Sequence, residues 1–246
     1  MTSGRSIVLQ GDIERAEEAV VFLPPAGSVT SPYFPLGGLL PPGLPAVHCE
    51  LPGRGRLVDE RPVGSVREAA DRWSGELARA LPGRRLHLFG HSLGSLFAYE
   101  TAARFTADPV CRIASLTVSA AREPGHAPRA AIGAAFAALS RQRRGTDADG
   151  DADGDRLATD LRIRREYRPH REPLAVPLAL LCGRDDTFVR PEEMPAWREF
   201  VTGRFLGLFT FDGGHDYYLA RPDPVASVIE RITETSRNST RTGSEK

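Results

Sequence analysis

The sequence predicts an α/β fold, in which a mostly parallel sheet carries helices on both faces. Three observations lead to this prediction. Short apolar runs alternate with stretches of helical periodicity. The runs are continuous rather than alternating, as expected for strands that are buried on both faces. The 246 residues, 41% hydrophobic and 26% charged, allow one α/β domain with a substantial core.

The elements of the first half follow one another in a strand–helix rhythm. Strands are expected at 20–23, 46–51, 86–89 and 113–119, and helices at 66–81 and 93–105. The first of these helices repeats Val66, Trp73 and Leu77 on one face, which is the pattern of a helix packed on a sheet. Several of the strands stop at proline or glycine, which end regular structure.

The rhythm breaks at residue 121 and resumes near residue 176. Strands at 176–181 and 205–211 and a closing helix at 224–235 complete the expected elements, with a frayed end at 236–246. We therefore divide the chain into an α/β core, residues 1–120 and 172–246, and a lid insertion, residues 121–171. Loops of α/β folds carry ligands at the C-terminal edge of the sheet, so the insertion is expected to cover that edge.

An Asp/Gly-rich tract at 147–155 lies within this insertion. Because it offers few apolar residues to bury, we expect a flexible, solvated segment. An alternative is a calcium loop, whose positions 1, 3, 5, 6 and 12 would be Asp149, Asp151, Asp153, Gly154 and Asp160. Asp160 is shorter than the usual bidentate Glu, and Arg156 replaces the apolar anchor of such a loop, so the solvated segment is favoured.

Charge and cysteine content exclude several classes of function. Lys+Arg and Asp+Glu are both 32, so no net charge attracts nucleic acid or an anionic membrane. Residues 1–18 lack the apolar segment of a signal peptide, and no apolar run reaches the roughly 18 residues of a membrane span. Cys49, Cys111 and Cys182 form no metal-binding pattern and lie in or beside apolar stretches, which indicates buried, reduced thiols. We expect a cytoplasmic protein.

The segment Gly90-His91-Ser92-Leu93-Gly94 fits the pattern G-x-S-x-G. An apolar strand leads into it and a helical stretch follows, which is the context of a nucleophile on a sharp strand-to-helix turn. The helix N-terminus also favours developing negative charge. Ser92 is therefore the candidate nucleophile, and the alternative is a glycine-rich turn with an incidental serine.

A serine hydroxyl needs a base and an orienting acid, which in such folds follow later strands in the order Ser, Asp/Glu, His. His215 follows the last strand on a glycine turn and is the candidate base. Asp185 and Asp186 both follow the strand at 176–181. The turn after Gly183 favours Asp186 as the acid, with Asp185 as the alternative. Asp212 is too close to His215 along the chain to orient it.

The other histidines are expected to have structural roles. His48 and His87 lie within predicted strands, where they should be packed or hydrogen-bonded. His91 adjoins the nucleophile and is expected to point into the turn. His126 and His170 lie in the insertion.

An oxyanion hole needs two backbone N–H groups. One comes from the residue after the nucleophile, Leu93, and the other from the loop after an early strand. That loop is Leu23-Pro24-Pro25-Ala26-Gly27-Ser28, and because proline has no N–H, Ala26 is the first possible donor. The alternative is a proline-rich turn without a chemical role.

Together these residues resemble the stand-alone type II thioesterases that accompany polyketide synthases and nonribosomal peptide synthetases. Five segments, in order, carry the resemblance: 22–27, Leu51-Pro52-Gly53-Arg54-Gly55-Arg56, 88–94, 183–186 with Val189, and 213–215 with Tyr218-Leu219. Pro25 stands where the family usually has His, Ser28 where a second Gly is common, and Leu93 replaces the more usual Met. None of these departures removes a catalytic atom.

The resemblance implies an α/β-hydrolase fold with Ser92, Asp186 and His215 as the triad and the Ala26 and Leu93 amides as the oxyanion hole. It implies hydrolysis of acyl groups from the phosphopantetheine arm of carrier proteins, without a metal or further cofactor, by a monomer. Three alternatives stay open. They are a carboxylesterase for small esters, an acyltransferase or cyclase that uses the same triad, and a non-catalytic module that binds carrier proteins.

Overall fold

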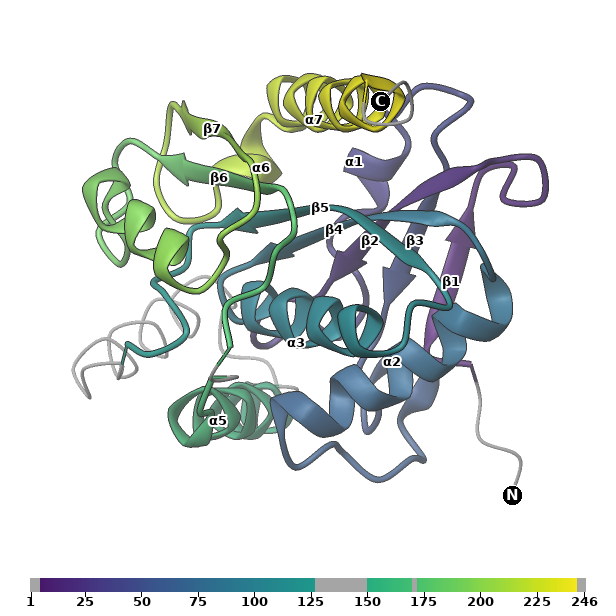
Figure 1. Cartoon of the computed structure of the whole chain (residues 1–246). Coiled ribbons are helices and arrows are strands. Elements are labelled where there is room, and N and C mark those ends of the chain that lie inside the picture. Colours follow the sequence, from purple (N-terminus) through teal and green to yellow (C-terminus); the bar gives the residue numbers. More distant parts are fainter. Residues whose placement is uncertain (1–4, 127–149, 170–171, 243–246) are drawn as a thin grey trace.

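The computed structural model describes residues 5–126, 150–169 and 172–242, which form a seven-stranded sheet with helices on both faces (Figure 1). The strands are β1 (Ile7–Gln10), β2 (Glu18–Leu23), β3 (Ala46–Cys49), β4 (Arg85–His91), β5 (Arg112–Ser119), β6 (Leu178–Gly183) and β7 (Phe205–Phe211). The helices are α1 (Phe34–Gly37), α2 (Val66–Ala80), α3 (Leu93–Ala107), α5 (Gly150–Glu166), α6 (Tyr217–Ala220) and α7 (Pro222–Thr242). Two 3-10 helices, η1 (Gly55–Leu57) and η2 (Pro191–Glu199), lie in connections.

The strand order is β1-β3-β2-β4-β5-β6-β7, and every neighbouring pair except β1 and β3 is parallel. The predicted α/β architecture is therefore confirmed. Because β4, β6 and β7 run in the same direction, the turns that follow them meet at one edge of the sheet.

Two hydrophobic cores lie on the two faces of the sheet. Val21 and Leu23 of β2 face the side of α2 and α3, whereas Val20 and Phe22 face the side of α1 and α7 (Figure 1). Successive residues of a strand point to opposite faces, so a strand covered on both sides must be apolar throughout. This explains why the buried strands read as continuous apolar runs.

Two terminal elements differ from the expectation. Ile7–Gln10 forms an antiparallel edge strand that the polar N-terminal sequence did not indicate, because Leu9 stays exposed and only Ile7 is fully buried. The closing helix α7 continues to Thr242 instead of fraying from residue 236. Ser236 is buried and Arg237 pairs with Glu18 at the start of β2, so this last part of the helix is attached to the core.

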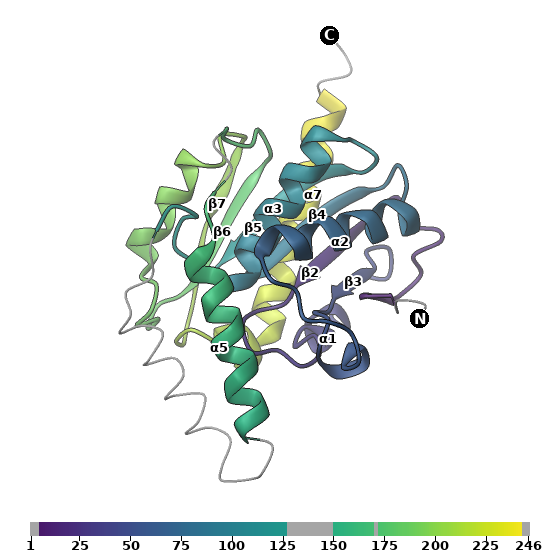
Figure 2. The ribbon, with the colours of Figure 1, turned by 90° about the horizontal axis from the view of Figure 1, so that it is seen from below.

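The Asp/Gly-rich tract also differs from the expectation, because its described part is helical. Helix α5 runs from Gly150 to Glu166 and lies on the α2–α3 side of the sheet (Figure 2). Leu157, Asp160 and Ile163 form its buried face, at helical spacing. Because the charged Asp160 lies within that face, the helical spacing of its buried residues could not be recognised from the sequence. Residues 127–149, including the Ala-rich patch, lie outside the described residues.

Other expectations can be checked directly. Cys49, Cys111 and Cys182 are free and buried, as predicted. Burial in apolar surroundings raises the pKa of Cys111 to about 11 and that of Cys182 to about 12, so these thiols stay protonated. Within the described ranges, no helix combines the length and the apolar character needed to cross a bilayer.

Candidate active site

Ser92 lies on a strained turn at the carboxyl end of β4. Its backbone has φ 54° and ψ −119°, in the region that favours glycine, and a residue other than glycine held there costs about 1–3 kcal/mol. The Ser92 N–H donates to Ser119 O of β5 at 2.8 Å, which holds the turn on the sheet. The Ser92 hydroxyl does not cap α3, although the residue stands at the start of that helix. The turn therefore presents the hydroxyl with no local structural task.

Asp186 and His215 meet because the turns after β6 and β7 are joined by backbone hydrogen bonds. Arg184 N donates to Phe211 O at 2.8 Å, and Asp185 N donates to Gly213 O at 3.0 Å. His215 Nδ1 lies 2.8 Å from Asp186 Oδ2. Because Asp186 accepts at this distance, Nδ1 carries the proton in the neutral imidazole, and Nε2 is the nitrogen that can accept one.

Asp186 is itself held by its own turn. Its Oδ1 accepts hydrogen bonds from Phe188 N at 2.8 Å and from Val189 N at 3.1 Å. The residue is only 3% exposed, so both carboxylate oxygens have partners where water has little access. A carboxylate fixed in this way can orient an imidazole and stabilise it when it becomes protonated.

His91 connects the serine turn to the histidine turn. Its ring lies beside the ring of His215, with centroids 4.7 Å apart, so His215 is next to the residue that precedes Ser92. His91 Nδ1 is 2.8 Å from Ser119 Oγ, which in turn is 2.7 Å from Tyr217 Oη. Burial and the neighbouring His215 hold the pKa of His91 well below its usual value, so it stays neutral. His91 thus lines the site as an uncharged, anchored ring.

The two candidate oxyanion segments lie against each other. A Cβ added to Gly94, in the first turn of α3, would come within 2.4 Å of Leu23 O and 3.0 Å of Pro24 O. This close approach requires glycine and sets the N-terminus of α3 beside the loop that contains Ala26. Leu93 is the first residue of α3, where backbone N–H groups have no partner within the helix. Both predicted amides are therefore placed in adjacent segments.

Asp160 joins the same loop, a contact that the sequence analysis missed. Gly27 N, next to Ala26, donates to Asp160 Oδ2 at 2.8 Å. Arg54 binds both oxygens of this carboxylate, each at 2.8 Å. The calcium alternative is therefore wrong at Asp160, since that residue is committed to Arg54 and the described tract is helical rather than a loop. Asp149 lies outside the described residues.

The remaining candidates have structural roles. His48 lies between Ser31 Oγ and Gln10 Oε1 at 2.9 and 2.7 Å, which confirms the expectation of a bonded strand histidine. His87 likewise contacts Ser115 Oγ at 2.8 Å and Glu18 at 3.3 Å.

Two carboxylates near the site lie at the surface, and one histidine of the insertion is described. Asp185 is exposed, and Asp212 forms surface pairs with Arg184 and Arg221. His126 contacts the Arg122 guanidinium at 2.9 Å, and His170 lies outside the described residues.

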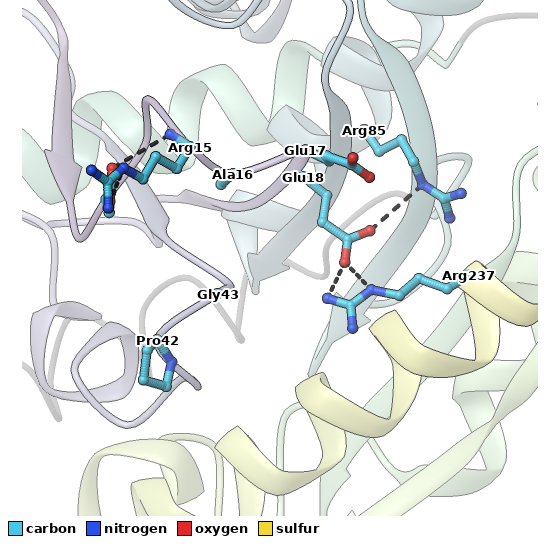
Figure 3. A pocket seen from close by; sticks show the side chains of 9 residues that line it. Arg15, Ala16, Glu17, Glu18, Pro42, Gly43, Arg85 and Arg237 are labelled. Carbon is cyan, nitrogen blue, oxygen red and sulfur yellow. Dashed lines mark hydrogen bonds and ion pairs between the residues drawn. The ribbon is translucent and has the colours of Figure 1, made fainter.

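A pocket of about 400 Å³ lies at the opposite edge of the sheet, where β2 and β4 begin (Figure 3). Three of its charged residues are paired, because Glu18 bridges Arg85 and Arg237. None of the candidate catalytic residues lines it. This pocket is therefore separate from the edge that carries Ser92.

Comparison with known proteins supplies the family. The Thioesterase domain family matches residues 18–234. The chain is 30% identical over 230 residues to a probable cadicidin biosynthesis thioesterase of Streptomyces griseus. The aligned segment covers 89% of this chain and 63% of that protein. It is also 32% identical over 210 residues to the thioesterase PikA5 of Streptomyces venezuelae, and this alignment covers 80% of this chain and 74% of PikA5.

A solved structure agrees with these relatives. The type II thioesterase BorB from the borrelidin biosynthetic cluster superposes with a TM-score of 0.80 at 27% identity, over 95% of this chain and 99% of BorB. The chain spans less than two thirds of the cadicidin relative and nearly the whole of BorB. With a match over most of its length and the sheet order described above, the chain belongs to the thioesterase domain family and has the α/β-hydrolase fold.

Proposed function

We propose that this chain hydrolyses acyl thioesters carried on the phosphopantetheine arm of carrier proteins in a polyketide or nonribosomal peptide pathway. The observation that carries the proposal is the 2.8 Å contact between Asp186 and His215 at the sheet edge where Ser92 occupies its strained turn. The relatives named as biosynthetic thioesterases support the substrate class. The reaction needs no cofactor beyond the arm that the substrate brings.

The proposed reaction uses His215 Nε2 as the acceptor of the Ser92 hydroxyl proton. Ser92 Oγ attacks the thioester carbonyl carbon while His215 Nε2 takes the hydroxyl proton. The tetrahedral intermediate collapses, the C–S bond breaks, and the proton on His215 passes to the leaving thiolate. Water then gives a proton to His215 and attacks the acyl-serine carbonyl. The C–O bond to Ser92 breaks, which releases the carboxylic acid and returns the proton to Ser92.

In this scheme the backbone stabilises the negative oxygen of each tetrahedral intermediate. The Ala26 and Leu93 N–H groups are the proposed donors, and removing one such donor from an enzyme typically lowers kcat by about 10²–10³-fold. Pro24 and Pro25 before Ala26 lack an N–H and restrict how the loop can turn. A thiol of pKa near 8.5 leaves more readily than an alcohol or an amine, so moderate activation of the serine is sufficient.

The insertion is the proposed lid. Residues 121–171 contribute α5, which contacts the oxyanion loop through Asp160. We propose that this segment meets the acyl chain or the carrier protein, and that the enzyme acts as a monomer. The partner is expected to be a carrier protein rather than a nucleic acid or a membrane, in line with the zero formal charge of the chain.

The test is intact-mass analysis of acylated carrier proteins incubated with the enzyme. The wild-type chain should return the free phosphopantetheine form and release the carboxylic acid, and Ser92→Ala should abolish turnover. Ser227→Ala removes a surface serine hydroxyl on α7 and should leave the rate unchanged. Retained turnover in Ser92→Ala would refute the mechanism.

The same assay separates the alternatives. Transfer of the acyl group to an added amine or alcohol would indicate an acyltransferase or cyclase. Hydrolysis of small esters with no effect on loaded carrier proteins would indicate a carboxylesterase. Absence of fluorophosphonate labelling at Ser92 would indicate a non-catalytic binding module, because only an activated serine reacts with that probe.

A further inference from the structure

We propose that Asp160 on α5 is a positioning residue for the oxyanion loop, residues 24–28, so that docking of α5 sets the catalytic competence of the site. The proposal rests on the proposed function, because it assigns Asp160 to the loop that carries the Ala26 amide. Neither the G-x-S-x-G segment nor the triad includes this residue.

Asp160 of α5 forms a buried, bidentate ion pair with Arg54, beside the loop. Arg54 Nη1 and Nη2 donate to the two oxygens of Asp160, each at 2.8 Å. The side chains of Arg54 and Asp160 are 4% and 0% exposed. Bidentate guanidinium–carboxylate pairs fix geometry in addition to charge, because both hydrogen bonds must be satisfied together.

The same pair holds the loop at two points. Asp160 Oδ2 accepts the Gly27 N–H at 2.8 Å, and Arg54 Nη1 donates to Ser28 O at 3.2 Å. The Gly27 N–H belongs to the peptide plane directly after Ala26, and Pro25 fixes the backbone directly before it. The orientation of the Ala26 N–H is therefore restricted from both sides, and one of the two restraints comes from α5.

The Arg54 side of the contact is fixed to the core. Gly55 follows Arg54 with φ 53°, and a Cβ there would lie 2.6 Å from Val29 O, just after the loop. The turn can therefore approach this segment so closely only with glycine at position 55. Arg54 thus belongs to a turn packed beside the loop, and Asp160 is the part of the contact that depends on α5.

Helix α5 has further anchors that do not involve Asp160. Leu157 and Ile163 are buried on the same face. Tyr167, just after the helix, donates its hydroxyl to Glu100 of α3 at 2.9 Å. A substitution at Asp160 therefore leaves most of the attachment of α5 in place, and its effect reports on the loop.

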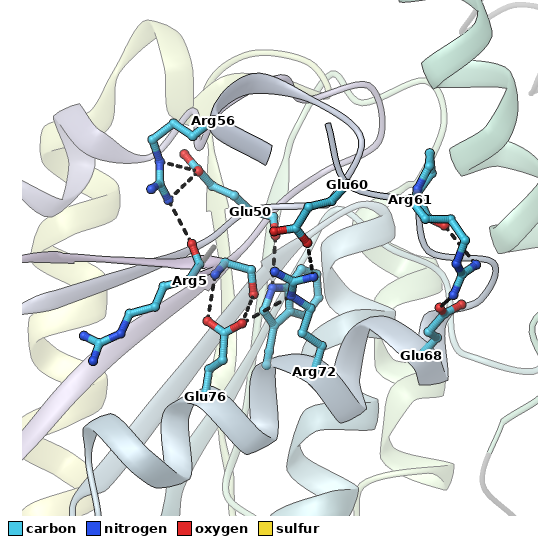
Figure 4. Close-up of polar contacts among 11 residues, drawn as sticks. Arg5, Glu50, Arg56, Glu60, Arg61, Glu68, Arg72 and Glu76 are labelled. Carbon is cyan, nitrogen blue, oxygen red and sulfur yellow. Dashed lines mark hydrogen bonds and ion pairs between the residues drawn. The ribbon is translucent and has the colours of Figure 1, made fainter. Parts of the chain in front are cut away.

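The chain offers a matched control in the same motif. Arg56 pairs with Glu50 at 2.7 Å, and the Glu50 side chain is 4% exposed (Figure 4). The other contact drawn for Arg56 is to the backbone carbonyl of Arg5, which precedes β1. Glu50→Gln thus removes a buried carboxylate whose partner Arg56 is 49% exposed, and the hydrogen bonds of these two side chains within the described residues do not involve residues 24–28.

The experiment compares Asp160→Ala, Asp160→Asn and Glu50→Gln in steady-state hydrolysis of acylated carrier protein. Asp160→Ala should lower kcat by about 10- to 100-fold with KM within about twofold, because displacing a reacting group or donor by an ångström costs up to about 10²-fold. Asp160→Asn keeps an acceptor for Gly27 N–H and should fall between Asp160→Ala and the wild type. Glu50→Gln should keep the wild-type kcat.

Three results would overturn the proposal. They are a kcat for Asp160→Ala within about twofold of wild type, a change confined to KM, and an equal loss in Glu50→Gln. If Asp160→Ala does not fold, the same criteria apply to the isosteric Asp160→Asn. Its kcat is expected to fall by at least about threefold, because about half of the smallest effect expected for Asp160→Ala, on a logarithmic scale, should remain.

A second readout separates this proposal from the proposed function. The rate of fluorophosphonate labelling at Ser92 requires the nucleophile and the oxyanion loop but no carrier protein. Slower labelling in Asp160→Ala than in Glu50→Gln supports the positioning role even if the carrier substrate is wrong. Equal labelling in both variants refutes it. Unlabelled wild-type Ser92 refutes the proposed function and this proposal together.

Discussion

The acid–base side and the oxyanion side of the site are both organised by a buried aspartate, but in different ways. Asp186 and Asp160 each accept backbone N–H groups, and each holds a partner side chain, His215 or Arg54. Asp186 takes its backbone donors from its own turn, two and three residues away. Asp160 takes its partners from segments 133 and 106 residues away.

This difference separates local from tertiary control of the site. The turn after β6 can form and hold its carboxylate wherever β6 and β7 pair. The oxyanion loop has bonds of its own, from Ser28 N and Oγ to Pro25 O, but its Gly27 N–H is held by Asp160 and therefore depends on the docking of α5. The acid–base side should therefore be insensitive to changes in α5, and the oxyanion side should respond to them.

The largest effect is expected from His215→Ala. Loss of the proposed base should lower kcat by about 10⁶-fold, as removal of the triad histidine does in a serine protease. Adding Ser92→Ala should cause little further loss, since members of a triad act as one unit. Steady-state hydrolysis of acylated carrier protein measures both. More than one hundredth of wild-type kcat in His215→Ala would place the base elsewhere.

Asp186→Asn should lower kcat by about 10⁴-fold, well beyond the loss expected for Asp160→Asn. The asparagine can still accept from Phe188 N and Val189 N through Oδ1, but its Nδ2 then faces His215 Nδ1 and favours the wrong tautomer. The unfolding midpoint in urea should change little, since the turn keeps its backbone bonds. Equal losses in the two variants would remove the distinction between the two sides.

The same distinction decides what the sequence could predict. Ser92, Asp186 and His215 each follow an apolar strand, and parallel strands bring their carboxyl ends to one edge, so order along the chain was sufficient to predict all three at the same edge of the sheet. Leu93 could be named as the residue after the nucleophile, and Ala26 because the two prolines before it lack an N–H. These positions depend on short-range rules of strand, turn and helix.

The contact of Asp160 with the oxyanion loop could not be predicted from such short-range rules. Its neighbours Leu157 and Ile163 are buried at helical spacing, yet the surrounding Asp and Gly residues suggested a solvated tract. The partners that allow a carboxylate on that face are Arg54 and Gly27, more than a hundred residues earlier. A buried charge is tolerated when it is paired, and sequence pattern alone does not reveal the pair. The edge strand β1 was missed because its residues are partly exposed and alternate weakly.

Acid should lower the free energy of unfolding through His48 of β3. Its ring stacks on Phe22 of β2, with centroids 5.3 Å apart, and burial lowers its pKa to about 4. The unfolded chain, with an ordinary histidine pKa of about 6.5, binds the proton first as pH falls. This contribution to stability is complete above pH 6.5 and is lost between 6.5 and about 4, by at most about 3 kcal/mol.

Urea unfolding at pH 7.5 and pH 5 measures this effect. His48→Gln should reduce the difference between the two pH values, because the glutamine does not titrate. The difference should not vanish, since burial also lowers the pKa of His87 and of His91. An unchanged difference in His48→Gln would show that His48 does not contribute to the acid response.

The smallest effect is expected from Asp185→Ala, which tests the acid–base side against its nearest competitor. Asp185 is exposed, and its bond in the turn comes from its backbone N–H to Gly213 O, which alanine retains. We expect kcat within about twofold of wild type and an unfolding free energy within about 0.5 kcal/mol, as for most surface substitutions. A loss comparable to that of Asp186→Asn would mean that the adjacent carboxylate orients His215. The carboxylate that the turn after β6 supplies to His215 would then be that of Asp185 instead of Asp186.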